Sequence, residues 1–311
     1  MNLRWVEYLV ALADERHFGR AAARCGVSQP TLSAQLRRFE EELGGPLVLR
    51  GPRIELTELG RRVIGPARQM LSLAEDIAWA GRDQEGPVTG EVRVGIFPTL
   101  AAYLLPHLIA GLEHDAPGVS LSVVEEKSAT LLGLLDAGEL DIALLASAVP
   151  AGLSSVPVFR EEFLLATPAD DPLGAEPGPV DPAALRGTDL ILMSEGHCLR
   201  DQVLQVCADS GSGVRKDIRP GSVATLSQLV AAGSGRTLMP RMAVSPPMAP
   251  DPRIALREFT EPRPHRDVVV CGRAPVLERR AVKALIGVLR DLPGGLVDPL
   301  GAEPSLEAVS L

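Results

Sequence analysis

The feature that most restricts the fold is a regular alternation of strand-like and helical segments in the middle of the chain. Three apolar segments with strand character are separated by two helical ones: residues 91–96, 104–113, 119–124, 129–135 and 141–145. Strands that alternate with helices predict a doubly wound α/β unit. Ligands of such units bind beyond the carboxyl ends of the strands, where Thr99 and Ser128 fall.

A second group of α/β elements follows the apolar segment 156–165. It begins with a strand at 190–193 and contains a helix at 196–209 and another at 226–232, whereas the strand 268–271 and the helix 279–289 indicate a return to the first unit. Two crossing segments predict two subdomains, the first at about 89–160 with 266–295 and the second at about 161–265. Residues 293–311 are expected to be a loosely ordered tail.

Composition and charge narrow the class of protein. A chain of 311 residues with 46% hydrophobic and 23% charged residues is globular and large enough for two or three folded units. The net charge of −9 argues against a protein that coats nucleic acid with its whole surface, yet residues 1–62 carry ten arginines against eight acids. Acids interrupt the apolar start of the chain, so we expect no signal peptide, no membrane span and a cytoplasmic protein.

The first 60 residues carry the pattern of a helix-turn-helix. Apolar residues at helical spacing predict a helix from Leu3 to about Glu15, small residues form a second helix at 19–24, and Gly26 closes it. Ser28 and Pro30 open a third helix that runs to about Leu43. A three-helix packing unit with a solvated polar face has the same spacing, so the pattern alone leaves both interpretations open.

Resemblance favours DNA binding. Residues 18–23, 27–33 and 56–60 resemble the head of LysR-type transcriptional regulators, a family whose third helix enters the major groove. The resemblance implies double-stranded DNA as a partner and base or phosphate contacts from Ser28, Gln29, Pro30, Thr31, Ser33, Arg37, Arg50 and Arg53. The last two arginines flank Gly51-Pro52 in a wing one residue shorter than is usual.

The same resemblance orders the chain into three parts. Residues 1–60 form the winged helix-turn-helix, residues 61–88 the linker helix with a kink expected at Pro66, and residues 89–311 a regulatory domain of two subdomains resembling periplasmic binding proteins. The linker's apolar stripe is compatible with packing on its own body, but in the family such helices pair. A homodimer or homotetramer is therefore expected.

Two of the four cysteines, Cys198 and Cys207, lie nine residues apart in one predicted helix. Such a step separates the Cα atoms by roughly 13 Å, whereas a disulfide needs about 7 Å or less. A bridge would require the helix to unwind, so the pair is either two unrelated thiols or a switch. Ser194 is the expected helix cap, and the helix dipole with His197 and Arg200 is expected to favour the thiolate. Metal binding is disfavoured, because close ligand pairs are missing.

Residues 196–202 with Cys207 resemble the redox segment of the hydrogen-peroxide sensors in the LysR-type family. The likeness to these sensors extends to residues 7–13, 104–107 and 230–235 in other parts of the chain. The resemblance implies that Cys198 is the peroxidatic and Cys207 the resolving cysteine. It also implies a peroxide pocket made of Thr99, Ser128, His197, Arg200, Asp201 and, by a looser register, Arg266. Ser128 stands where a threonine is usual, which keeps the hydroxyl.

The resulting expectation is a regulator of oxidative-stress genes that is not an enzyme and needs no cofactor or metal. Its expected partners are DNA, hydrogen peroxide, a thiol reductant such as glutaredoxin or thioredoxin, and RNA polymerase. Cys25 and Cys271 are expected to be buried hydrophobes. A LysR-type regulator that responds to an organic ligand, a thiol peroxidase and a solute-binding transport protein are the alternatives.

Overall fold

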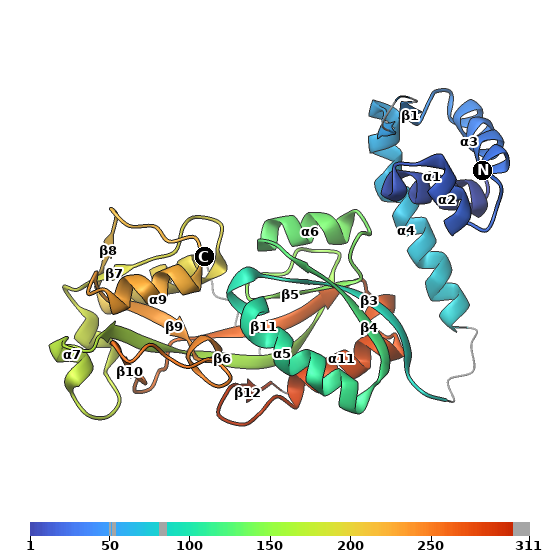
Figure 1. Cartoon of the computed structure of the whole chain (residues 1–311). Helices are drawn as coiled ribbons and strands as arrows, with labels where there is room; N and C mark the ends of the chain where they lie inside the picture. The colour runs from blue at the N-terminus through green and yellow to red at the C-terminus, as the bar shows by residue number, and fades with distance from the viewer. Residues whose placement is uncertain (50, 52–53, 81–85, 301–311) are drawn as a thin grey trace. The chain divides into compact units, whose positions relative to one another are not determined.

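The computed structural model of the chain describes residues 1–49, 51, 54–80 and 86–300 (Figure 1). It contains two compact units, one formed by residues 1–86 with 133–140 and the other by residues 87–132 with 141–311. No helix in the described part of the chain is both long and apolar enough to cross a bilayer. The predicted limits at residues 60, 88, 160 and 265 stay predictions.

The first unit contains the predicted helix-turn-helix and wing. Its elements are α1 (Leu3–Glu15), α2 (Phe18–Arg24), α3 (Gln29–Leu43), β1 (Val48–Leu49), β2 (Glu55–Leu56) and α4 (Glu58–Ala80). The short strands β1 and β2 pair antiparallel. The apolar faces of α1, α2 and α3 form one core that includes Leu9, Leu12, Ala21, Leu32, Leu36 and Phe39.

The turn between α2 and α3 forms as its residues predict. Gly26 has a φ of +66°, a conformation that a residue with a Cβ rarely adopts. The Ser28 hydroxyl accepts a hydrogen bond from the Thr31 backbone N–H at 3.3 Å, and Pro30 occupies the first turn of α3. The predicted start and end of α3 are both confirmed.

Helix α4 extends from Glu58 to Ala80 and contains Pro66 in its interior, as expected for the linker helix. Leu73 and Ile77, one turn apart, are exposed to 47% and 75%. Large apolar side chains on a helix surface are commonly covered by another chain.

The first part of the second unit is a parallel three-stranded layer. Strand β3 (Thr89–Ile96) pairs in parallel with β4 (Gly118–Glu125) and with β5 (Ile142–Leu145). The helices α5 (Pro98–Asp115) and α6 (Ser128–Asp136) connect these strands. The doubly wound expectation is therefore confirmed for these elements, and α5 begins six residues earlier than the pattern predicted.

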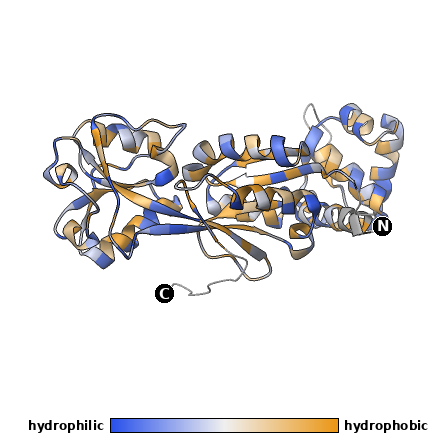
Figure 2. Ribbon diagram, turned by 90° about the horizontal axis from the view of Figure 1, so that it is seen from below, coloured by the Kyte–Doolittle hydropathy of each residue, from blue (hydrophilic) through white to orange (hydrophobic). Residues whose placement is uncertain are grey.

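Two long strands cross between the halves of the second unit. Strand β6 (Ser154–Pro168) pairs antiparallel with β11 (His265–Gly272) along its first half, and β11 also pairs with β5. The second half of β6 pairs with β9 (Thr237–Pro240) and β10 (Ile254–Arg257). We call the part with β3, β4 and β5 the first lobe and the part with β7 to β10 the second lobe. Figure 2 shows hydrophilic and hydrophobic stretches along the strands that join them.

The second lobe surrounds its own apolar core, which includes Phe163, Leu190, Leu199, Val203, Leu226 and Met239. Its remaining elements are α7 (Pro172–Ala175), η1 (Pro182–Leu185), β7 (Asp189–Ile191), α8 (Cys198–Ser210), β8 (Gly213–Arg215), α9 (Val223–Ala231) and η2 (Arg241–Val244). The expectation that Ser194 caps the cysteine helix is wrong. Gly196 has a φ of +86°, which breaks a helical path, so α8 begins at Cys198 with His197 as the preceding cap residue.

The chain then returns to the first lobe through α10 (Ala274–Leu277) and α11 (Arg280–Arg290), as predicted. The expectation of a loose tail from residue 293 is wrong for the described residues. Leu296 and Val297 are buried, and β12 (Asp298–Pro299) pairs with Arg160 and Phe159 of β6. Residues 301–311 lie outside the described part of the chain.

Candidate functional site

Both predicted redox cysteines lie in α8, Cys198 in its first turn and Cys207 in its last. The nine-residue step in a regular helix gives roughly 13 Å between their Cα atoms. Both are free thiols in this structure. Direct bridging from this conformation is therefore excluded by geometry, since a disulfide needs about 7 Å or less.

Cys198 closes a small hollow between the two lobes. The hollow is lined by Phe97, Pro98, Thr99, Lys127, Ser128, Gly196, His197 and Cys198. The Thr99 hydroxyl oxygen lies 4.0 Å from the Cys198 sulfur. Thr99 comes from the start of α5 and Ser128 from the start of α6, so the carboxyl ends of β3 and β4 meet the start of α8 here, as the α/β pattern predicted.

A buried guanidinium supports Thr99. Arg266, on the crossing strand β11, donates from Nη1 to the Thr99 hydroxyl and from Nη2 to the Thr99 carbonyl oxygen, both at 3.0 Å. Its Nε donates to Glu161 of β6 at 2.7 Å, and both side chains are fully buried. The Arg266 guanidinium carbon lies 5.1 Å from the centre of the Phe97 ring. Because Arg266 donates to the Thr99 oxygen, the hydroxyl hydrogen is free to point at sulfur or at a bound oxygen.

The electrostatics of Cys198 differ from the expectation. Burial raises the pKa of the Cys198 thiol, and this effect exceeds the lowering by Arg266, the Thr99 hydroxyl and the Leu199 N–H. Burial and the charge of Lys127 lower the pKa of His197, so the imidazole is neutral at pH 7. The expectation that His197 and Arg200 favour the thiolate is wrong, since Arg200 instead donates to the Met193 carbonyl at 3.0 Å.

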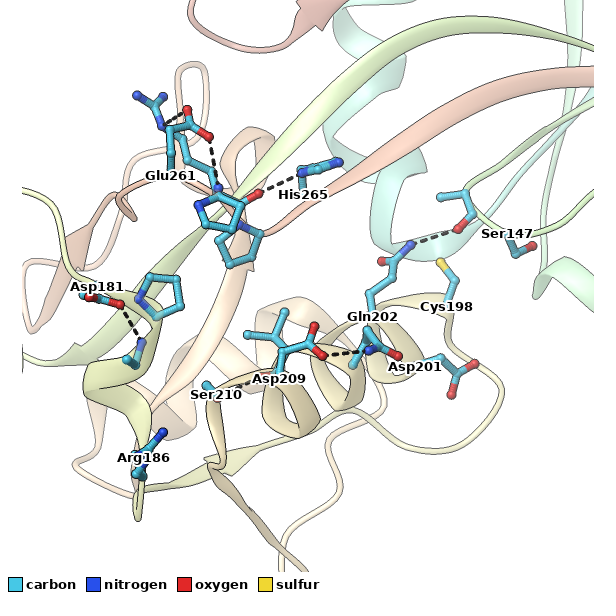
Figure 3. A pocket seen from close by; sticks show the side chains of 18 of the residues that line it. Ser147, Asp181, Arg186, Cys198, Asp201, Gln202, Asp209, Ser210, Glu261 and His265 are labelled. Atoms are coloured by element: carbon cyan, nitrogen blue, oxygen red, sulfur yellow. Dashed lines mark hydrogen bonds and ion pairs between the residues drawn. The ribbon is translucent and has the colours of Figure 1, made fainter. Parts of the chain in front are cut away.

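Asp201 and Cys198 also border a larger groove of about 710 Å³ that follows α8 to Ser210 (Figure 3). Asp201 is exposed and does not line the small hollow with Thr99. On the same helix, Gln202 donates to the Ala146 carbonyl at 2.9 Å, which ties α8 to the first lobe. The structure thus brings Thr99, Ser128, His197, Cys198 and Arg266 together, and it places Arg200 and Asp201 outside that group.

Cys207 has a different environment. Its side chain belongs to the apolar core of the second lobe and is 5% exposed. Burial raises the pKa of its thiol, with a smaller opposing effect of Ser212. Its sulfur lies 3.8 Å from the Gly213 carbonyl oxygen. Cys207 can therefore meet Cys198 only after the end of α8 has left this core.

The other two cysteines are buried, as predicted, Cys25 in the core of the first unit and Cys271 in β11. Burial raises the pKa of Cys271 to about 11. Among the described residues, no group of three or more His, Cys, Asp or Glu side chains is arranged to hold a metal ion.

The predicted DNA-contacting residues of α3 occupy the first two turns and one later position of that helix. Ser28, Gln29, Pro30, Thr31 and Arg37 are exposed, and Ser33 is half-buried. The Ser28 hydroxyl already accepts the capping hydrogen bond from the Thr31 backbone N–H and lies 2.8 Å from the Thr31 hydroxyl, to which it is also hydrogen-bonded. Arg50 and Arg53 lie outside the described residues.

Two residues of the site were missed from sequence. Glu161 is an acid within a long apolar strand, and its pairing with Arg266 follows from the register of β6 and β11. Lys127 precedes α6, next to Ser128, and its Nζ reaches the Glu195 carbonyl at 2.9 Å. A charged residue within the largely apolar segment 156–165 is the one signal that could have identified Glu161.

Comparisons with known proteins agree with this arrangement. Residues 3–61 match the bacterial regulatory helix-turn-helix protein, lysR family, and residues 85–293 match the LysR substrate binding domain. The chain is 39% identical over 270 residues to the DNA-binding transcriptional dual regulator OxyR of Escherichia coli K12, which covers 86% of this chain and 88% of that protein.

Solved structures are similar over nearly the whole length. A full-length OxyR variant from Pseudomonas aeruginosa is 33% identical, has a TM-score of 0.82 and covers 98% of this chain and 99% of that one. An OxyR mutant from Corynebacterium glutamicum with hydrogen peroxide bound is 31% identical, has a TM-score of 0.62 and covers 93% of each chain. The chain belongs to the LysR family of bacterial transcriptional regulators.

Proposed function

We propose that this LysR-type regulator senses hydrogen peroxide through Cys198 and Cys207 and controls oxidative-stress genes. The observation that carries the proposal is the position of Cys198, which lies beside Thr99 and Arg266 but a helix length away from its partner thiol. Relatives of 37–39% identity in Escherichia coli and Streptomyces viridosporus are described as hydrogen peroxide-inducible genes activators, which favours this function over a response to an organic ligand.

The chemistry has two steps. The Cys198 thiolate attacks one peroxide oxygen, the O–O bond breaks, and the leaving oxygen takes a proton and departs as water, which leaves a sulfenic acid. The Cys207 thiolate then attacks the Cys198 sulfur, an S–S bond forms, and the sulfenic oxygen leaves as a second water. Two electrons pass from the two thiols to the peroxide.

The pocket residues have distinct roles in the first step. The Thr99 hydroxyl donates to the peroxide and stabilises the negative charge on the leaving oxygen, and the Arg266 guanidinium holds that hydroxyl in place. Ser128 and neutral His197 complete the wall of the hollow.

The second step changes the fold. Joining Cys198 to Cys207 dismantles α8, removes Cys207 from the core of the second lobe and breaks the hydrogen bond from Gln202 to Ala146. The two lobes lose one of their links, so the oxidised regulatory domain presents a different surface to its copies. Reduction by a dithiol protein such as glutaredoxin or thioredoxin restores α8.

The readout is DNA binding. The exposed start of α3 enters the major groove of double-stranded DNA, with Gln29, Thr31 and Arg37 as the contacting side chains. The exposed Leu73 and Ile77 of α4 pair with the same face of a second copy, which supports a homodimer that assembles further to a homotetramer. Contact with RNA polymerase and a cytoplasmic location complete the proposal.

The test compares DNA footprints of the reduced and the peroxide-treated protein on the promoter it protects. The wild-type footprint is expected to change in length or position on oxidation, and the Cys198→Ser footprint is expected to stay in the reduced form. Mass spectrometry of the treated wild type should show a Cys198–Cys207 bridge. A footprint that shifts with an organic ligand and ignores peroxide would refute the proposal.

A further inference from the structure

Lys127 connects the two lobes beside the reactive sulfur. Its carbonyl accepts the Leu131 N–H at 3.0 Å, so its backbone is fixed as the residue before α6. Its side chain extends to the second lobe, where Nζ donates to the Glu195 carbonyl oxygen at 2.9 Å. Glu195 lies in the four-residue loop that leads from Met193 to Cys198. The lysine therefore holds the segment from which α8 starts.

The conformation of Gly196 fits this contact closely. Its φ of +86° excludes most other residues, and a Cβ there would lie 3.1 Å from both Cδ and Nζ of Lys127. Lys127 also lines the hollow together with Thr99, Ser128, His197 and Cys198. The lysine side chain covers the glycine and forms the wall of the hollow on that side.

We propose that Lys127 is a positioning residue of the peroxide reaction, which fixes the loop 194–197 so that Cys198 faces Thr99 and Arg266. The inference rests on the proposed function, since it concerns the same thiol. Lys127 does not contact the oxidant's reacting atoms in this role. It acts through the backbone of Glu195 and Gly196, and an error of about 1 Å in the placement of a reacting group costs up to a hundredfold in rate.

The charge of Lys127 also acts on the neighbouring His197, whose protonation state affects the position of the loop. It lowers the pKa of His197, after the larger effect of burial. The charged side chains of this region also include Glu195 on the same loop, Arg219 at 3.8 Å from Glu195, Arg200 and Asp201 on α8, and Arg266 on the far side of Thr99. Neutral His197 can lie against the lysine without repulsion, whereas a protonated imidazole would push the loop away from it.

The experiment uses full-length protein with the additional change Cys207→Ser, so that oxidation stops at the sulfenic acid of Cys198. Sulfenic acid is trapped with dimedone and counted by intact-protein mass spectrometry after short exposures to hydrogen peroxide. The variants are Lys127→Met, which keeps the length of the stem, and Lys127→Arg, which keeps the charge and the donor. Lys283→Met is the matched control, because Lys283 pairs with Glu278 beside α11 and lies outside the hollow.

Lys127→Met is expected to slow sulfenic acid formation about tenfold at pH 7. Lys127→Arg and Lys283→Met are expected to stay within about twofold of the parent. NMR titration of the His197 imidazole should show a higher pKa in Lys127→Met and an unchanged one in Lys127→Arg, a result that a purely structural lysine would not give. Thermal unfolding should coincide for the Lys127 variants, since the contact is at the surface.

The outcomes separate the two proposals. If the parent forms no sulfenic acid at Cys198, the proposed peroxide sensing fails, and this inference fails with it. If the parent reacts and Lys127→Met reacts equally fast, the positioning role alone is wrong. Equal slowing by Lys127→Met and Lys127→Arg would also overturn it, because the donor would then not matter.

Discussion

The two ends of α8 place the same side chain in opposite environments. Cys198 lies in a hollow with a fixed hydroxyl at 4.0 Å and a buried guanidinium behind it, whereas Cys207 is surrounded by the apolar core of the second lobe. Burial raises the pKa of both thiols and a hydroxyl opposes it at each, Thr99 at Cys198 and Ser212 at Cys207, but only at Cys198 does a positive charge, that of Arg266, also oppose it. The two thiols of this helix thus differ in the charge and the donors that surround them, and not in whether they are buried.

The largest expected effect comes from removing the guanidinium that distinguishes the two ends. Arg266→Met leaves Glu161 as an uncompensated buried carboxylate, so the free energy of unfolding should fall by about 3–5 kcal/mol. Sulfenic acid formation should also become slower in the protein that remains folded. Urea denaturation followed by circular dichroism measures the first effect.

The matched control is Arg160→Met, because Arg160 precedes Glu161 in β6 and also forms an ion pair with a residue of β11. Arg160 pairs with Asp267 at 2.6 Å, but both side chains are more than a third exposed. Such a pair contributes roughly 1 kcal/mol or less. Equal losses in the two variants would contradict the view that burial makes the Arg266–Glu161 pair important.

The raised pKa of Cys198 predicts a steep pH dependence. A thiol with a raised pKa is almost fully protonated at neutral pH, so the thiolate fraction and the oxidation rate should grow about tenfold per pH unit. The rate is measured between pH 6 and pH 9 by dimedone trapping in the Cys207→Ser background. A plateau below pH 7 would show that the thiolate is favoured, and that burial is not the dominant influence.

Thr99→Val tests the hydroxyl that faces the sulfur. The change keeps the shape, removes the donor at 4.0 Å from the sulfur and leaves one Arg266 N–H without its acceptor. Oxidation of Cys198 should slow by roughly tenfold, corresponding to about 1.4 kcal/mol of lost transition-state stabilisation. Thr99→Ser retains the hydroxyl and should remain close to wild type. A rate unchanged by Thr99→Val would show that the Thr99 hydroxyl takes no part in the oxidation of Cys198.

The last comparison places serine at each of the two cysteine positions, where the difference between the two variants is expected to be small. Cys207→Ser buries a hydroxyl in an apolar core and should lower the free energy of unfolding by about 1–3 kcal/mol. Cys198→Ser places the hydroxyl beside Thr99, where it can form a hydrogen bond, so its loss should be smaller. Thermal or urea unfolding of the reduced proteins distinguishes them, and the reverse order would contradict the contrast between the two environments.

Much of the fold follows from local patterns. Gly26, Ser28 and Pro30 indicated the helix-turn-helix, and its turn and cap form in the structure as these residues require. The alternation of strands and helices from residue 91 placed Thr99 and Ser128 at one edge of a parallel sheet, where both are found. These predictions succeed because turn conformation, helix capping and hydrophobic periodicity depend on residues close together in the chain.

Other features misled local reasoning. Ser194 is a good helix cap by type, but Gly196 adopts a conformation that ends any helical path there. Residues 293–300 were expected to belong to a loosely ordered tail, yet Asp298 and Pro299 pair with β6. In the first case the backbone conformation of Gly196 outweighs the capping preference of Ser194. In the second, pairing with a strand far away in sequence orders a segment that has no strong preference of its own.

The sequence by itself determined that two cysteines share one helix and that a bridge between them must unwind it, because helix rise is fixed by the backbone. Only the tertiary structure decided which of the surrounding side chains act on Cys198. Arg266 and Glu161 meet through the register of two strands that are far apart in sequence, Lys127 arrives from the other lobe, and Arg200 turns away. The tertiary structure also decided that the pKa of the Cys198 thiol is raised and not lowered, because desolvation depends on every segment that covers the sulfur.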